Sequence, residues 1–106
     1  SIFDALAARR FARDPEEERQ ARKAARRYLG CDLLILDDLG SEQDLPSARS
    51  SLYELVNSRL QAARHTIISS NLSTQEIGSR YGAQIGSRVA GLYWELTFYG
   101  NDLRLS

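Results

Sequence analysis

The chain has 106 residues, which is enough for one small domain with a modest hydrophobic core. With 42% hydrophobic and 26% charged residues, its composition is that of an ordinary globular chain and excludes a low-complexity or disordered class. Fourteen basic and fourteen acidic side chains cancel, so the overall charge favours no nucleic-acid partner and leaves only local basic patches to consider.

The cysteine count and the hydropathy pattern restrict the setting of the protein. A single cysteine, Cys31, excludes an internal disulfide and a cysteine-based metal site. No apolar run reaches membrane length and no signal peptide is visible, so we expect a cytoplasmic protein with no membrane partner. Because the chain lacks methionine and opens directly into helical periodicity, we expect it to be an excised piece of a longer protein.

Two helices are predicted before the first strand. The first covers residues 2–13 and places its apolar side chains on one face: Ile2, Phe3, Leu6, Ala7 and Phe11. The second begins after Asp14, a good N-cap, with Pro15 at its first position, and Gly30 closes it. Basic residues are dense from Arg19 to Arg27, where the helix dipole is a sufficient explanation and a nucleic-acid role is the alternative.

Four consecutive aliphatic residues, Leu33 to Leu36, predict a strand that is buried on both faces of a parallel sheet. Asp37 and Asp38 follow directly, and Gly40 then lets the chain turn away. Open parallel sheets bind ligands outside the carboxyl ends of their strands, so paired acids at this place indicate a divalent cation with phosphate attached. The alternative is that the two acids are turn residues that end the strand.

A long helix is predicted next, from Leu45 to about Arg64, with an apolar stripe formed by Leu52, Leu55, Val56, Leu60 and Ala63. His65 ends this helix. A lone histidine at a helix C-terminus is more often a partner of the helix dipole than a metal or substrate ligand. The second strand covers residues 66–71, is rich in β-branched residues and again ends in a polar residue, Asn71.

Two further helices and a third strand complete the predicted elements. Ser73 and Glu76 have capping-box spacing, so a helix begins there and runs to about Tyr81, where Gly82 stops it. The next helix covers roughly residues 83–90 and has three inward apolar residues, Ile85, Val89 and Leu92. Aromatic and β-branched residues at 93–99 favour a strand. Alternating strands and helices predict an α/β fold, with short parallel strands flanked by helices.

Three sequence motifs occur in a specific order along the chain. They are LLILDDLG at 33–40, TIISSNLS at 66–73, and RYGAQIGSRVAGLY at 80–93 followed by FYGNDLR at 98–104. Together they resemble the C-terminal part of an AAA+ ATPase domain, closest to the DnaC/DnaI-type bacterial helicase loaders and the related IstB transposon ATP-binding proteins. The resemblance covers essentially the whole chain and implies that residues 1–106 are the C-terminal portion of one such domain.

The resemblance implies a role for each polar residue at the strand ends. The first strand becomes the Walker B strand, in which Asp37 binds Mg²⁺ through water. Asp38 stands at the position of the residue that polarises the attacking water and acts as general base. Asn71 matches the sensor-1 position, which orients water or contacts the γ-phosphate of ATP; its alternative is a turn or N-cap residue before the helix at Ser73.

Three arginines are implied as nucleotide-contacting residues. Arg88 aligns with the arginine finger that one subunit inserts into the site of its neighbour, a role that suits a permanently charged guanidinium. Arg80 is the rival finger, and a surface salt bridge is the alternative reading of Arg88. Arg104 aligns with a sensor-2-like arginine that faces the nucleotide in the same subunit; its alternative is a terminal charge without a role.

One departure from the family pattern affects the expected activity. The chain contains no GxxxxGK[ST] loop, the segment that cradles the phosphates of ATP. The resemblance therefore implies a partial P-loop NTPase domain that lacks the first two strands, and the chain alone is expected neither to bind nor to hydrolyse ATP appreciably. The strand order of the family also predicts that the three strands of the chain do not form one contiguous sheet.

The function implied by the resemblance is that of an ATP-dependent helicase loader. The intact protein would bind ATP and Mg²⁺, associate with copies of itself through the arginine-finger face, contact single-stranded DNA and help place a replicative DNA helicase. An IstB-like helper ATPase of transposition shares every motif and is one alternative. A non-hydrolytic interaction module, in which the acids have lost their role, is the other.

Overall fold

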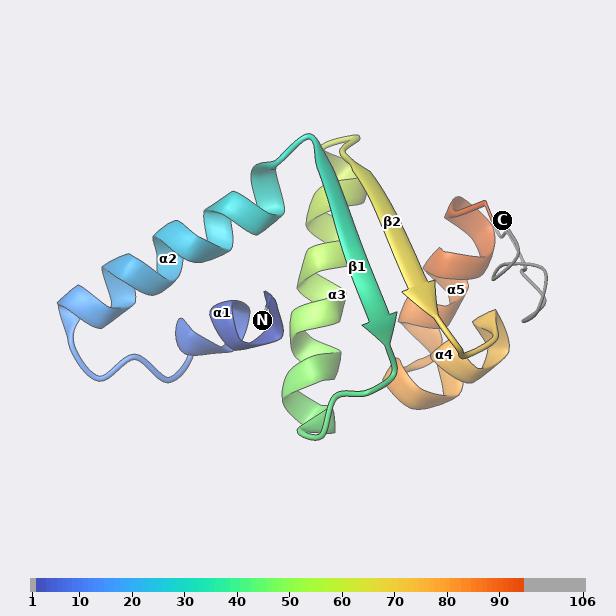
Figure 1. Ribbon diagram of the computed structural model, residues 1–106, viewed down its shortest axis with the longest axis horizontal. Helices are drawn as coiled ribbons and strands as arrows, with labels where there is room; N and C mark the ends of the chain where they lie inside the picture. The colour runs from blue at the N-terminus through green and yellow to red at the C-terminus, as the bar shows by residue number, and fades with distance from the viewer. Residues whose placement is uncertain (1, 95–106) are drawn as a thin grey trace, which may run out of the picture.

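The computed structural model describes residues 2–94 and confirms an α/β chain in which parallel strands are flanked by helices. Figure 1 shows α1 and α2 beside one edge of the strand pair, α3 behind it, and α4 with α5 beside the other edge. The elements in chain order are α1 (Ile2–Ala8), α2 (Pro15–Gly30), β1 (Leu33–Leu39), α3 (Leu45–Gln61), β2 (His65–Ser70), α4 (Thr74–Tyr81) and α5 (Ala83–Leu92).

β1 and β2 form a parallel pair in which Leu34 lies opposite Thr66 and Leu36 opposite Ile68. One face of this pair packs on α3, because Leu34 and Leu36 turn inward to a core that also contains Leu52 and Leu55. The core is continued by the apolar faces of the other helices, with Leu6, Ala25, Ile77, Tyr81, Ile85 and Val89 among its buried members.

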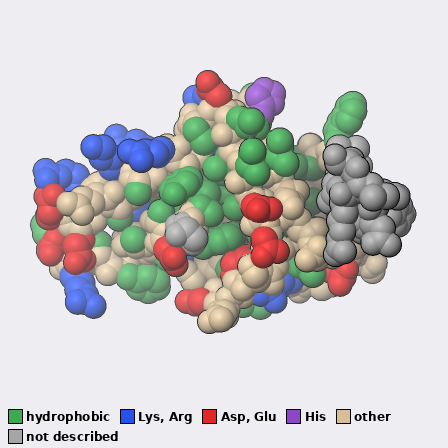
Figure 2. All heavy atoms as spheres, viewed as in Figure 1, with side chains coloured by type: hydrophobic (Ala, Val, Ile, Leu, Met, Phe, Trp, Pro, Cys, Tyr) green, Lys and Arg blue, Asp and Glu red, His purple; other side chains and the backbone are tan. Residues whose placement is uncertain are grey.

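The prediction that the first strand is buried on both faces is wrong. Leu33 and Ile35 of β1 are 53% and 62% exposed, and Ile67 of β2 is 52% exposed. Successive side chains of a strand point to opposite faces, and within residues 2–94 no helix covers the face that these three occupy. Figure 2 shows this face as a hydrophobic area with acidic side chains next to it.

The first helix is shorter than predicted, and the second begins where its sequence signals place it. α1 ends at Ala8, and Phe11, expected on its apolar face, is 69% exposed. Just after the helix ends, Arg9 pairs with Glu54 of α3. Asp14 caps α2 as predicted: its side chain accepts a hydrogen bond from the Glu17 backbone N–H at 2.8 Å.

α3 ends at Gln61, three residues before the predicted end, and His65 starts β2 instead of closing the helix. Ala63, expected on the apolar stripe, lies in the turn with φ 54° and is exposed. Near the end of α3 a charged residue is completely buried: Arg59 has 0% of its surface exposed. Its guanidinium donates to the carbonyls of Tyr28 and His65 at 2.9 and 2.7 Å.

α4 and α5 form a tight helical hairpin. Ser73 and Glu76 make both hydrogen bonds of the predicted capping box, and Gly82, with φ 113°, forms the turn between the helices. The two helices cross at Gly78 and Gly86, where a Cβ added to Gly86 would lie only 2.6 Å from the Cα of Gly78. Leu92, expected to turn inward, is 63% exposed at the end of α5.

Two predictions about the sheet are not tested by the described residues. The strand expected at 93–99 falls largely outside them, because the description ends at Trp94. The parallel pair β1–β2 alone does not define a P-loop NTPase sheet, so this arrangement stays a prediction. Within the described part of the chain, no helix has the length and hydrophobicity needed to span a membrane.

Candidate functional site

A β-bulge at the end of β1 presents both predicted acids to solvent. The pairing with β2 runs from Leu36 opposite Ile68 to Leu39 opposite Ser70, so Asp37 and Asp38 together oppose one residue of the partner strand. In a regular strand, Asp38 would turn toward the core with Leu36. The extra residue instead returns Leu39 to the core, where it is 2% exposed, and leaves both carboxylates outside.

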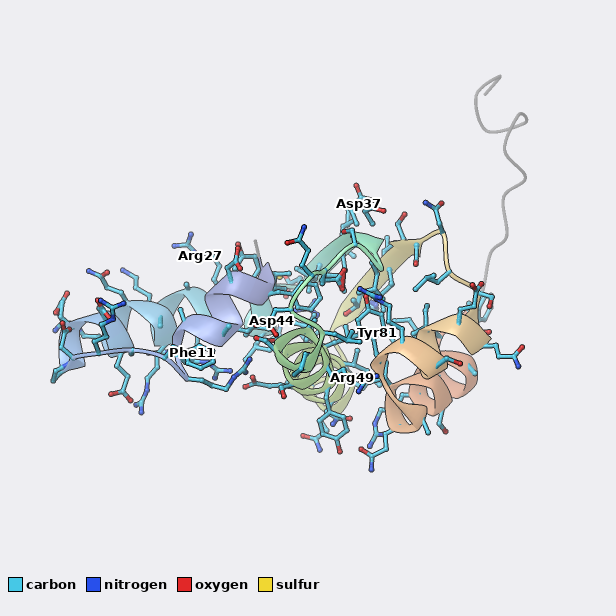
Figure 3. All side chains as sticks on the ribbon, turned by 90° about the horizontal axis from the view of Figure 1, so that it is seen from below. Phe11, Arg27, Asp37, Asp44, Arg49 and Tyr81 are labelled. Carbon is cyan, nitrogen blue, oxygen red and sulfur yellow. The ribbon has the colours of Figure 1, made fainter. Side chains whose placement is uncertain are left out.

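The backbone at the bulge has a conformation that few residues adopt. Asp38 has φ 58°, in the left-handed region where aspartate is among the best tolerated non-glycine residues. The Ser41 hydroxyl donates to the Asp38 carbonyl at 3.1 Å and helps to hold this turn. Figure 3 shows the Asp37 side chain on the sheet side of the molecule, pointing away from the helices.

The end of β2 is joined to the end of β1 by one serine. The Ser70 hydroxyl donates to the Leu39 carbonyl and accepts a hydrogen bond from the Leu72 backbone N–H at 3.0 Å. Asn71 follows this serine and is exposed, so the structure brings it to the same edge of the sheet as Asp37 and Asp38. Ser70 lies in one of the recognised motifs, yet sequence reasoning assigned it no role, since many serines follow strands only as turn residues.

Glu42 connects the bulge to α4. Its carboxylate accepts hydrogen bonds from the Gly40 backbone N–H at 3.0 Å and from the Tyr81 hydroxyl, and its carbonyl accepts from Arg80 Nη2 at 2.6 Å. Arg80, the rival arginine finger, is therefore hydrogen-bonded to the loop between β1 and α3. The sequence gives no signal for Glu42, because its partner Tyr81 lies 39 residues further along the chain.

Burial raises the pKa of Tyr81 to about 12, and the hydrogen bond to the Glu42 carboxylate contributes to the same shift. Folding therefore stabilises the protonated phenol of Tyr81 relative to the unfolded chain, in which the tyrosine pKa is near 10. We expect this contribution to stability to be complete below pH 10 and to be lost as the pH rises to about 12.

Tyrosinate absorbance measured against pH checks this expectation. A Tyr81→Phe chain should lack the part of the absorbance change centred near pH 12, and Glu42→Gln should move that part to lower pH. An unchanged high-pH titration in the Tyr81→Phe chain would contradict the assignment.

Arg88 makes its contacts on α3 and α5 and not at the sheet edge formed by Asp37, Asp38 and Asn71, called here the acidic edge. Its guanidinium is 5.5 Å from the centre of the Tyr53 ring on α3, and its Nη1 donates to the Gln84 carbonyl at 3.3 Å. The neighbouring hollow, about 520 Å³, is lined by residues of α3 and of the α4–α5 turn, among them Arg49. Figure 3 shows Arg49 across α3 from Asp37. The structure therefore brings Asp37, Asp38 and Asn71 to one edge of the sheet, while the contacts of Arg88 among the described residues are with α3 and α5; Arg104 lies outside the described residues.

The donor chemistry of the acidic edge fits a hard cation. Carboxylates of Asp37 and Asp38 and the amide oxygen of Asn71 are the ligand types that Mg²⁺ prefers. Among residues 2–94 no three or more His, Cys, Asp or Glu side chains are grouped as a metal site. Magnesium bound there would take most of its coordination shell from water and from a phosphate ligand, as this small cation commonly does.

Comparison with protein-family models, with curated proteins and with solved structures found no match to this chain.

Proposed function

We propose that the chain is the C-terminal portion of an AAA+ ATPase domain of the helicase-loader type, with the acidic edge as the Mg²⁺ side of its nucleotide site. Its partners would be single-stranded DNA, a replicative DNA helicase and further copies of the same chain. The observation that carries the proposal is the bulge, which brings Asp37 and Asp38 out of the core beside Asn71 at adjacent carboxyl ends of parallel strands.

Ending the strand would not by itself require the change of register that the bulge produces. A turn that only ended the strand could leave one acid in the regular alternation, whereas here the register changes so that both carboxylates leave the core while Leu39 remains in it. Keeping Asp38 at φ 58° costs backbone strain, and such strain is concentrated at functional sites. These features support metal and phosphate chemistry over the turn-residue reading.

Each residue of the edge has a distinct task in this proposal. Asp37 would hold Mg²⁺, and the metal would neutralise phosphate charge when it is bound. Asp38, held outward by the bulge, accepts a proton from the attacking water. Asn71 orients that water through its side-chain amide. Ser70 fixes the distance between the two strand ends, because its hydroxyl bonds to the Leu39 carbonyl.

The arginine finger of the proposal acts between subunits. The contacts of Arg88 among the described residues are with Tyr53 and Gln84 and with neither acid of β1, as is needed of a finger that acts on a neighbouring subunit. Its contact with the Tyr53 ring would restrict the conformations of the Arg88 side chain before a neighbouring subunit binds. Arg80 is held more firmly within its own subunit: it donates to the Glu42 carbonyl of a distant loop at 2.6 Å, whereas Arg88 donates to the Gln84 carbonyl of its own helix at 3.3 Å. The geometry therefore favours Arg88 over Arg80 as the finger.

The test is ATP turnover of the longer protein that joins this chain to a phosphate-binding loop, measured with and without single-stranded DNA. Asp37→Asn and Arg88→Ala should each lower turnover at least about tenfold. Asp37→Asn weakens the hold on the Mg²⁺ that would neutralise phosphate charge, and Arg88→Ala removes the cation that would stabilise the transferring phosphoryl group. Mixing the two variants should restore part of the activity, since each supplies the residue that the other lacks.

Asp32→Asn is the matched control for Asp37→Asn. Asp32 lies just before the opposite end of β1, and its side chain is 96% exposed and pairs within residues 2–94 with Arg64 alone, so its loss should leave turnover within about twofold. Unchanged turnover in both Asp37→Asn and Arg88→Ala would refute the proposed site.

A further inference from the structure

The exposed side of α2 carries a ridge of positive charge. Between residues 19 and 27 this helix has no acidic residue and five basic ones: Arg19, Arg22, Lys23, Arg26 and Arg27, called here the α2 ridge. At 100° per residue these five occupy an arc of about 140°, opposite the stripe that buries Ala21 and Ala25. Figure 2 shows basic side chains gathered along the edge of the molecule that Figure 1 assigns to α2.

The helix dipole does not account for the α2 ridge. Favourable interaction of cations with the dipole is confined to the last turn, where α2 has only Arg27. Arg19 and Arg22 pair with Glu16 and Glu18 of the same helix. Lys23, Arg26 and Arg27 are exposed, and no side-chain hydrogen bond or ion pair to them occurs within residues 2–94.

The cations of the α2 ridge repel one another along the helix, although two of them, Arg19 and Arg22, also pair with glutamates. Three pairs of like charge stand four residues apart: Arg19 with Lys23, Arg22 with Arg26, and Lys23 with Arg27. Each such pair destabilises a helix by about 0.2–0.5 kcal/mol, a cost that a bound polyanion removes. The ridge therefore has the charge distribution of a surface that binds an anionic partner.

We propose that the α2 ridge binds the phosphate backbone of single-stranded nucleic acid without sequence preference. The five cations span about 12 Å of helix axis and a wide arc of a convex surface. A flexible single strand can wrap this surface, whereas a stiff duplex touches it along one line. The ridge contains no aromatic residue on which bases could stack, so contact is to phosphates and not to bases.

The same surface is poorly suited to a membrane. Helices that bind membranes insert an apolar face among the lipids, while the apolar face of α2 is already used, since Ala21 and Ala25 are buried within the protein. The inference uses no residue of the proposed nucleotide site, so its failure and the failure of the ATPase proposal are distinguishable.

Binding of the full chain to a fluorescently labelled thymidine oligonucleotide, followed by anisotropy over a series of salt concentrations and without nucleotide, tests the proposal. Arg26→Gln/Arg27→Gln should weaken binding about tenfold and reduce the slope of log K against log salt by about 1.4, because each lost phosphate contact contributes about 0.7 on a single strand. Glutamine keeps the helix propensity of the replaced residues, and circular dichroism checks that α2 is retained.

Arg49→Gln/Arg64→Gln removes the same charge away from the ridge and should change the affinity less than twofold. Equal losses in the two double variants would show an effect of net charge alone and overturn the proposal. Absence of binding to the oligonucleotide, tighter binding to a duplex of the same length, or binding to phosphatidylserine vesicles in its place would also overturn it.

Discussion

Replacing Arg59 by methionine is expected to lower the free energy of unfolding by about 3 kcal/mol. The guanidinium of Arg59 is fully buried and joins three elements. Nη1 donates to the Tyr28 and Leu29 carbonyls at the end of α2, Nη2 to the His65 carbonyl, and Nε to the Thr66 hydroxyl of β2 at 2.8 Å. The last carbonyls of α2 have no partner within the helix, so Arg59 acts as their cap.

Two opposing terms decide the sign of this effect. Within residues 2–94 no carboxylate pairs with Arg59, so its burial costs several kcal/mol in desolvation, and methionine removes that cost. Methionine also removes the hydrogen bonds to three carbonyls and a hydroxyl, and each buried acceptor left unsatisfied costs about 1–3 kcal/mol. The second term is larger, so the variant is destabilised.

Denaturant unfolding of Arg59→Met beside Arg59→Lys and Arg64→Met measures the effect. Lysine keeps the charge but loses the forked geometry, so an intermediate loss is expected. Arg64 pairs with Asp32, whose side chain is 96% exposed, and its replacement should cost less than about 1 kcal/mol. A loss for Arg59→Met no greater than that for Arg64→Met would contradict the capping role.

Gly86→Ala is expected to destabilise the chain by about 1–2 kcal/mol, although alanine is the better helix former by about 1 kcal/mol. The added Cβ would lie 2.6 Å from the Cα of Gly78, and both atoms belong to helix backbones that cannot move away cheaply. Separating α4 from α5 would disturb the packing of Ile77 and Ile85, which are buried between these helices and the core. The steric cost therefore exceeds the gain in propensity.

Gly91→Ala is the matched control in the same helix. A Cβ at Gly91 would meet no atom within 4 Å, so the gain in propensity should appear as an increase in stability of about 0.5 kcal/mol. Thermal unfolding of the two variants gives the comparison. Stabilisation by both substitutions would show that α4 and α5 do not cross closely at Gly86.

The order and type of the described elements were predictable because their signals are local. Asp14 with Pro15, and Ser73 with Glu76, specify helix starts through hydrogen bonds that span three residues, and the structure contains both caps. The spacing of Leu52, Leu55 and Val56 predicted the buried face of α3 for the same reason. Such contacts depend only on the neighbouring sequence.

Element ends and exposed apolar residues were predicted less well, because they depend on what packs nearby. Phe11 has helical spacing but follows a helix that ended three residues earlier, where Arg9 pairs with α3. The run of aliphatic residues in β1 indicated burial of both faces, yet burial of Leu33 and Ile35 needs a covering element that the described residues do not supply. Hydrophobicity alone does not report the presence of such a partner.

Local sequence signals specify the α/β pattern, the helix caps, the position of Asp37 and Asp38 near the end of the first strand, and that of Asn71 just after the second. Tertiary structure decided the rest: the bulge that exposes both acids, the links made by Ser70 and Glu42 and the burial of Arg59. Each of these includes at least one contact between residues about 30 or more positions apart along the chain, where no local periodicity or capping rule applies. Whether a side chain faces solvent or core is set by those distant contacts.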